Sequence, residues 1–199
     1  MRIWIFVLFV LPSLVSAQTP SSIAFYYNSI DSVRELMNYD RVVVTADLIT
    51  PKQIGTLHKA KTKVFAYLSV GEFDGQILPD NLRTSSPARN ENWQSYAMDL
   101  NDPQWQLYLT QKAEAYLSKG FDGLFLDTLD SYYLFAKSEK RQYQQQQALV
   151  SIIARLDQLT GKPELILNRG FEIIEQLQHP VSAVLAESLY NSYHPVDNS

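Results

Sequence analysis

The chain contains six short apolar runs, and each run ends in a polar side chain. The clearest run follows Gly120, passes through Leu124-Phe125-Leu126 and stops abruptly at Asp127. Near-continuous apolar runs that alternate with helical stretches are typical of parallel strands buried on both faces. In α/β folds, ligands bind where the carboxyl ends of such strands meet, so we expect the closing polar residues to surround a functional site. In chain order these residues are Asn28, Asp47, Glu72, Asp127, Asn168 and Glu187.

Local signals divide the chain into strands and helices. The expected strands cover residues 23–28, 41–47, 63–72, 120–127, 164–170 and 183–190. A short helix is expected over residues 31–37, and the sequence TPKQ at 50–53 is a typical helix start. A helix over 138–160 is expected to expose the glutamines of residues 144–147 to solvent.

A further helix opens at Asp102-Pro103 and ends before Gly120. Apolar residues recur along it at helical spacing, which predicts that they pack in the core. These residues are Trp105, Leu109, Ala113, Tyr116 and Leu117.

Six strand–helix units of about 30 residues each predict an α/β fold of the (β/α)8 TIM-barrel type. A doubly wound sheet is the alternative, but it does not usually place a polar side chain at every strand end. The sequence around Gly71 also lacks the further glycines that a phosphate-binding turn needs. Because such barrels usually take about 250 residues and this chain has 199, we expect the barrel to be truncated after its sixth strand. Exposed sheet edges would then make an isolated monomer marginally stable and weakly active.

The first 17 residues have the pattern of a signal peptide. A basic residue, Arg2, precedes an apolar stretch, and Val15-Ser16-Ala17 provides small residues for cleavage. This stretch is too short for a stable membrane span, and no later stretch approaches the roughly 20 apolar residues that a span needs. We therefore expect an exported protein, periplasmic or extracellular, with a single hydrolase-like barrel domain over residues 18–199.

Composition narrows the chemistry further. The chain has no cysteine, which excludes disulfides and thiolate metal sites, and its three histidines lack ligand-like spacing. We therefore expect no metal and no other cofactor. The net charge of −4 argues against nucleic acid as a partner.

Carboxylates dominate the expected site. We expect five acids to meet at the carboxyl ends of the strands: Asp47, Glu72, Asp127, Asp130 and Glu187. The alternative for Asp130 is that it caps the following helix. No cysteine nucleophile and no Gly-x-Ser-x-Gly turn is present, so acyl transfer has little support. Carboxylates without a metal or a histidine suit glycoside hydrolysis, which requires two of them.

Other parts of the chain are expected to contact a sugar substrate. The segment between Glu72 and Trp93 has no clear periodicity, and we expect a loop that covers the substrate. Tyrosines near the strand ends are suited to stacking on sugar rings, although each is equally suited to packing. These are Tyr27, Tyr67, Tyr132 and Tyr190.

Four ordered motifs resemble the endo-α-1,4-polygalactosaminidase type of glycoside hydrolase. They are AYLSVGE at 66–72, GFDGLFLDTLDSY at 120–132, LNRG at 167–170 and AESL at 186–189. The resemblance implies a (β/α)8 barrel that cleaves partly deacetylated, α-1,4-linked N-acetylgalactosamine polymers. By matched position it implies that Asp127 and Glu187 are the catalytic pair, and we assign Asp127 as the nucleophile and Glu187 as the acid/base.

Substrate binding is expected from Tyr27, Asp47, Tyr67, Glu72, Asp130, Asn168, Arg169 and Tyr190. An acidic mouth fits a polymer that carries free amines. The alternative from another functional class is a degenerate barrel that binds polysaccharide without cleaving it. A polysaccharide deacetylase is disfavoured, because the histidine placement offers no metal site.

Overall fold

The computed structural model describes residues 21–186, and its main sheet has six parallel strands in the order β1-β2-β3-β7-β8-β9. Strand order follows chain order without the reversal that defines a doubly wound sheet, which confirms the expected TIM-barrel type and rejects the alternative. The strands are β1 (Ile23–Tyr26), β2 (Arg41–Val44), β3 (Lys63–Ser69), β7 (Gly123–Asp127), β8 (Glu164–Asn168) and β9 (Ala183–Leu185).

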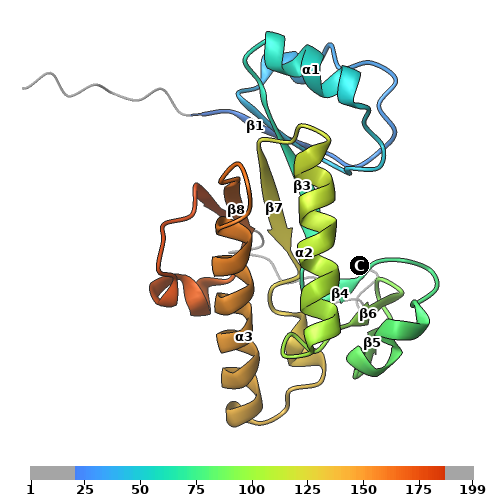
Figure 1. Ribbon diagram of the computed structural model, residues 1–199, viewed down its shortest axis with the longest axis vertical. Coiled ribbons are helices and arrows are strands. Elements are labelled where there is room, and N and C mark those ends of the chain that lie inside the picture. Colours follow the sequence, from blue (N-terminus) through green and yellow to red (C-terminus); the bar gives the residue numbers. More distant parts are fainter. Residues whose placement is uncertain (1–20, 187–199) are drawn as a thin grey trace, which may run out of the picture.

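Three α-helices cover one face of this sheet, and α2 and α3 run beside each other along the strands (Figure 1). They are α1 (Pro51–Lys59), α2 (Pro103–Ser118) and α3 (Glu139–Asp157). Short 3-10 turns connect other elements: η1 (Leu36–Asn38), η2 (Asp80–Ser85), η3 (Ser131–Leu134) and η4 (Phe171–Gln176). Within residues 21–186, none of the helices combines the length and the apolar character needed to cross a membrane.

The predicted helix starts are confirmed. Thr50 and Gln53 form a reciprocal capping box at the start of α1, with Pro51 in the first turn. The Asp102 carboxylate accepts hydrogen bonds from the N–H groups of Gln104 and Trp105 at the start of α2. The predicted apolar stripe of α2 also packs in the core.

The segment after β3 differs most from the prediction. The expected strand over 63–72 ends at Ser69, and the chain then forms a second, antiparallel sheet in the order β4-β6-β5. Its strands are β4 (Glu72–Phe73), β5 (Ala88–Asn90) and β6 (Ser95–Ala97). Because these strands pair with one another, the segment that was expected to be an irregular loop is a folded subdomain. This sheet lies at the opposite end of the molecule from α1 (Figure 1).

Two smaller predictions were wrong. The expected helix over residues 31–37 is reduced to the single turn η1, although Val33 and Leu36 are buried. Gln144 and Gln147 are exposed as expected, but Gln145 does not face solvent. It is 1% exposed, its Oε1 accepts from Leu100 N–H, and its Nε2 donates to Asp99 Oδ1. A polar side chain can be buried in this way because backbone and carboxylate partners satisfy it.

The main sheet has a different apolar cluster on each face. The face toward the helices belongs to a large buried cluster that includes Leu68, Leu124 and Leu126. The opposite face, which we call the inner face, has a small buried cluster of Val43, Phe65, Phe125 and Ile166. Ile23, Phe25, Tyr67, Ala183 and Leu185 pack against this cluster but stay partly exposed.

The described residues do not cover every prediction. The expected leader over residues 1–17 lies outside them. So do two predicted site residues, Glu187 and Tyr190.

Candidate active site

A cavity of about 680 Å³ opens where the carboxyl ends of β3, β7 and β8 meet the second sheet. Its size lies within the usual range for ligand sites, about 300–1,000 Å³. Inner-face residues form its floor, because side chains alternate along a strand and Tyr67, Asp127 and Asn168 share the face of Phe65, Phe125 and Ile166. The lining residues are Tyr27, Thr45, Tyr67, Ser69, Glu72, Asp74, Asn90, Trp93, Ser95, Asp127, Thr128, Asp130, Ser131, Asn168 and Arg169.

Asp127 is the last residue of β7, and both of its carboxylate oxygens accept hydrogen bonds. The Tyr67 hydroxyl donates to Oδ2 at 2.6 Å, and Asn168 Nδ2 donates to Oδ1 at 2.8 Å. Burial raises the pKa of Tyr67, and the neighbouring Asp127 carboxylate raises it further. Tyr67 therefore stays protonated and remains a donor, so two strands on either side of β7 hold one carboxylate in place.

The backbone around Asp127 is held as tightly as its side chain. Val70 N–H donates to Asp127 O, and Gly71 N–H donates to Thr128 Oγ1, both at 2.9 Å. A Cβ on Gly71 would lie 2.1 Å from Thr128 O, so only glycine allows this close approach. Thr128 itself has a φ of +61°, a conformation that is costly outside glycine and that recurs at functional sites.

Asp130 and Arg169 form an ion pair at the cavity wall. Arg169 Nη1 lies 2.9 Å from Asp130 Oδ2. Asp130 occupies the N-cap position of η3, but its side chain makes no capping hydrogen bond, so the alternative of a helix cap is wrong. Arg169 reaches this position from a backbone with φ of +62°, just after the end of β8.

Glu72 also lines the cavity, but its side chain is 5% exposed. Its Oε1 accepts from Asn90 Nδ2 at 3.0 Å and from Ser131 Oγ at 2.5 Å, and its Oε2 accepts from Ser95 Oγ. The carboxylate therefore joins β5, β6 and η3 to one another.

Asp47 is not brought to the cavity. It pairs with Lys119 Nζ at 3.0 Å and is absent from the lining residues. Of the acids expected to converge, the structure therefore gathers Glu72, Asp127 and Asp130, while Glu187 lies outside the described residues. Tyr27 and Tyr67 do meet at the cavity, with ring centroids 5.3 Å apart in an edge-to-face arrangement.

Several lining residues were missed by sequence reasoning. Trp93, Asn90 and Asp74 all come from the segment that was expected to be a loop, where no pattern distinguished them. Asp74 also pairs with Lys112 Nζ at 3.6 Å. Of the three, only Trp93 offered a sequence signal, as an aromatic residue within the polar run of residues 89–95.

The cavity is acidic. Four carboxylates line it, from Glu72, Asp74, Asp127 and Asp130, against the single guanidinium of Arg169 among the lining residues. Over residues 21–186, no three carboxylates or histidines are grouped so as to hold a metal ion. The chemistry that the cavity offers is that of carboxylates with tyrosine, amide and hydroxyl donors.

Comparisons with known proteins identify a family and solved structures with a similar fold. A family model described as glycoside-hydrolase family GH114 matches residues 15–197. The glycoside hydrolase domain of PelA from Pseudomonas aeruginosa has 39% sequence identity and a TM-score of 0.81, over 89% of this chain and 71% of that one. A variant of that domain with one glutamate replaced by alanine has 40% identity and a TM-score of 0.77, over 83% and 66% of the two chains.

A more distant structure shares the fold. Ega3 from Aspergillus fumigatus, in complex with galactosamine, has 16% identity and a TM-score of 0.60, over 78% of this chain and 62% of that one. No curated protein matches the chain. The resemblance to polygalactosaminidase-type hydrolases is confirmed.

Proposed function

The chain belongs to glycoside-hydrolase family GH114, and from this premise we propose that it hydrolyses α-1,4-linked polymers of galactosamine and N-acetylgalactosamine with two carboxylates, Asp127 and Glu187. The observation that carries the proposal is the setting of Asp127. It lies at a strand's carboxyl end, opens to a cavity of ligand size, and has both oxygens held by donors from neighbouring strands.

The substrate class is supported by charge and by the relatives. A polymer with free amines is cationic at neutral pH, and the lining carboxylates outnumber the guanidinium of Arg169. Ega3 was crystallised with galactosamine, and the PelA domain has 39% identity to this chain. An amine held among carboxylates gains more than a hydroxyl would, since hydrogen bonds between charged groups are stronger.

The two carboxylates have different roles in this proposal. Asp127 accepts from Tyr67 and Asn168, which suits a nucleophile that attacks the anomeric carbon. Glu187 protonates the departing glycosidic oxygen, and it then takes a proton from the water that releases the glycosyl–enzyme intermediate. The reaction retains the anomeric configuration.

Sequence spacing supports Glu187 as the second carboxylate. Leu185 pairs with Asn168 in the register of β8 and β9, and it packs with the inner-face cluster. In an extended strand, residues two positions apart share a face. In the sequence, Glu187 follows Leu185 by these two positions.

We also propose export of the protein. The sequence pattern of residues 1–17 supports it. Detection of the mature amino terminus at Gln18 in the periplasm or medium would test this step.

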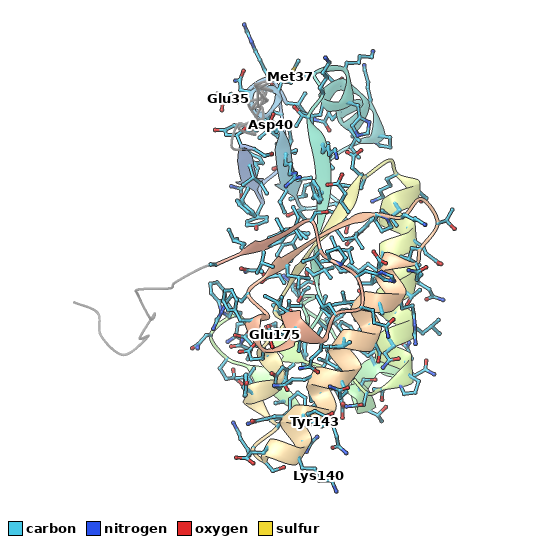
Figure 2. The ribbon with its side chains drawn as sticks, turned by 90° about the vertical axis from the view of Figure 1, so that its left-hand side faces the viewer. Glu35, Met37, Asp40, Lys140, Tyr143 and Glu175 are labelled. Carbon is cyan, nitrogen blue, oxygen red and sulfur yellow. The ribbon has the colours of Figure 1, made fainter. Side chains whose placement is uncertain are left out.

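Asp127→Asn and Glu187→Gln test the catalytic pair. Each should lower kcat on the order of 10⁴-fold, while binding of the polymer is kept, because each change removes a group that acts mainly in the transition state. The measurement is release of reducing ends from the amino-sugar polymer, with a pull-down on the same polymer for binding. Glu175→Gln, an exposed acid at the surface (Figure 2), is the matched control.

The outcomes separate the two functions considered. Full turnover in Asp127→Asn or Glu187→Gln would refute the catalytic assignment. Binding without reducing-end release by the wild type would instead favour a barrel that binds polysaccharide and does not cleave it.

A further inference from the structure

The turn between β5 and β6 carries an exposed tryptophan at the cavity. Trp93 is 78% exposed and is one of the lining residues, although it comes from the second sheet and not from the barrel strands. An indole ring exposed to this degree in a cavity of ligand size has an open face available for stacking.

The position of this turn depends on one buried carboxylate. Glu72 accepts hydrogen bonds from Asn90 at the end of β5 and from Ser95 at the start of β6, the two residues that flank the turn. It also accepts from Ser131, four residues after Asp127. Glu72 therefore ties both ends of the Trp93 turn to the segment that follows the proposed nucleophile.

The contacts of Glu72 differ from those of a substrate ligand. Its two oxygens already accept three hydrogen bonds from protein donors, and its side chain is almost completely buried. A substrate amine would have to displace one of these donors and leave it without a partner, which costs free energy.

We propose that Trp93 forms a sugar-binding subsite apart from Asp127, and that Glu72 is the positioning residue that holds it there. This inference rests on the proposed function and replaces the expected direct contact between Glu72 and substrate. The ligand is a pyranose ring of an amino-sugar polymer, whose C–H face packs on the indole and whose protonated amine is attracted to the ring. Asp74 and Asn90, which line the same cavity, lie within the same subdomain.

The first test removes the stacking surface. Trp93→Ala should raise KM for the polymer about tenfold and leave kcat nearly unchanged, because the contact is made equally in ground and transition states. Trp93→Phe should restore part of the affinity. Tyr143→Ala, which removes an exposed aromatic ring from α3 outside the cavity (Figure 2), should change neither parameter. An unchanged KM in Trp93→Ala would overturn the subsite.

The second test separates positioning from direct contact. Glu72→Gln keeps an oxygen for Asn90 and Ser131, and the Ser95 hydroxyl can turn to accept from the new amide, so KM should stay within about twofold of wild type. Glu72→Leu leaves three donors without a partner and should raise KM about as much as Trp93→Ala does. When Trp93→Ala is already present, adding Glu72→Leu should raise KM by less than about a further twofold. The two changes are not additive because Glu72 acts on the substrate only through Trp93.

Two results would overturn the positioning role. One is a large rise of KM in Glu72→Gln, which a direct charge contact predicts. The other is a full additional rise for Glu72→Leu in the Trp93→Ala background. If Glu72→Leu does not fold, Ser95→Ala, which removes a single donor to Glu72, takes its place. Its effect on KM is again compared with and without Trp93→Ala.

A binding measurement keeps this inference separate from the proposed function. In the Asp127→Asn variant, α-1,4-linked galactosamine oligomers should change the tryptophan fluorescence, and Trp93→Phe should abolish the change. Trp105 is buried and donates to Val70 O, so it does not report on the cavity. A fluorescence change with an inactive wild type would support the subsite and refute catalysis, and activity without a fluorescence change would do the reverse.

Discussion

The two faces of the main sheet are built from the same strands but have different tasks. On the face toward the helices, side chains of the central strands are apolar and buried along their whole length. On the inner face, the side chains of β2, β3 and β8 change along the strand, from a charged residue at the amino end, through an aromatic or aliphatic residue, to the cavity at the carboxyl end. Arg41 and Lys63 pair with Glu164 at one end, and Tyr67 and Asp127 lie toward the other.

Neighbouring residues show the difference most directly. Leu126 is fully buried against the helix-covered side, and Asp127, the next residue, opens to the cavity. Because successive side chains of a strand point to opposite faces, one strand supplies both a core residue and a site residue. The comparison teaches that the helix-covered face contributes most of the stability. The inner face can therefore carry the polar groups of the cavity.

The largest effect on stability is expected from Leu126→Ala. Removing this buried side chain should lower the free energy of unfolding by about 2–5 kcal/mol, through lost burial and the cavity left behind. The folded fraction should keep wild-type kcat/KM. Asp127→Asn should show the opposite pattern, with stability within about 1 kcal/mol of wild type. Denaturant unfolding and kinetic measurements on Leu126→Ala and Asp127→Asn test this prediction. Equal losses of stability in the two variants would contradict the difference between the faces.

Tyr67→Phe should affect activity more than stability. The change removes one of the two donors that hold the Asp127 carboxylate, while the ring contacts with Tyr27 and Phe125 remain. A lost hydrogen bond to a charged group costs about 1.5–3 kcal/mol, so we expect kcat/KM to fall at least tenfold. Tyr143→Phe, on the exposed surface of α3, serves as the control. Wild-type kinetics in Tyr67→Phe would show that Asp127 does not need this donor.

The free energy of unfolding should depend on Tyr67 at alkaline pH. Burial and the Asp127 charge raise the folded-state pKa of Tyr67, so in the unfolded chain this hydroxyl loses its proton first, near pH 10. The folded state then binds more protons than the unfolded state, and stability that is fully present below pH 10 is lost as pH rises further. The slope is at most about 1.4 kcal/mol per pH unit. Unfolding titrations of wild type and Tyr67→Phe should diverge only above pH 10, and parallel curves would contradict the assignment.

The smallest effect is expected at the amino ends of the inner face. Glu164 pairs with Lys63 and lies 3.8 Å from Arg41 Nη2, but all three side chains are partly exposed. Glu164→Gln should therefore cost no more than about 1 kcal/mol, and the cost should shrink in high salt. Reducing-end release should be unaffected. If Glu164→Gln lowered the free energy of unfolding by several kcal/mol, the inner face would contribute more to stability than this comparison predicts.

Local sequence signals determined the elements of the barrel. Thr50 and Asp102 satisfy free N–H groups within one turn, and Gly120 adopts a φ of +103° after α2. These interactions span a few residues and leave a pattern that can be recognised in sequence. The position of Asp127 followed from the same logic, since an acid at the end of an apolar run lies at the edge of a parallel sheet.

Tertiary structure decided the partners of the polar side chains. Glu72 and Asp47 both follow apolar runs, but Glu72 is buried by donors from β5, β6 and η3, and Asp47 pairs with Lys119. Gln145 likewise bonds to residues 45 or 46 positions away. The second sheet, and the place of Trp93 in the cavity, also depend on such distant contacts. Strand periodicity and helix caps describe only neighbours in the chain, so the sequence predicted where the site lies, while packing determined which side chains enter it.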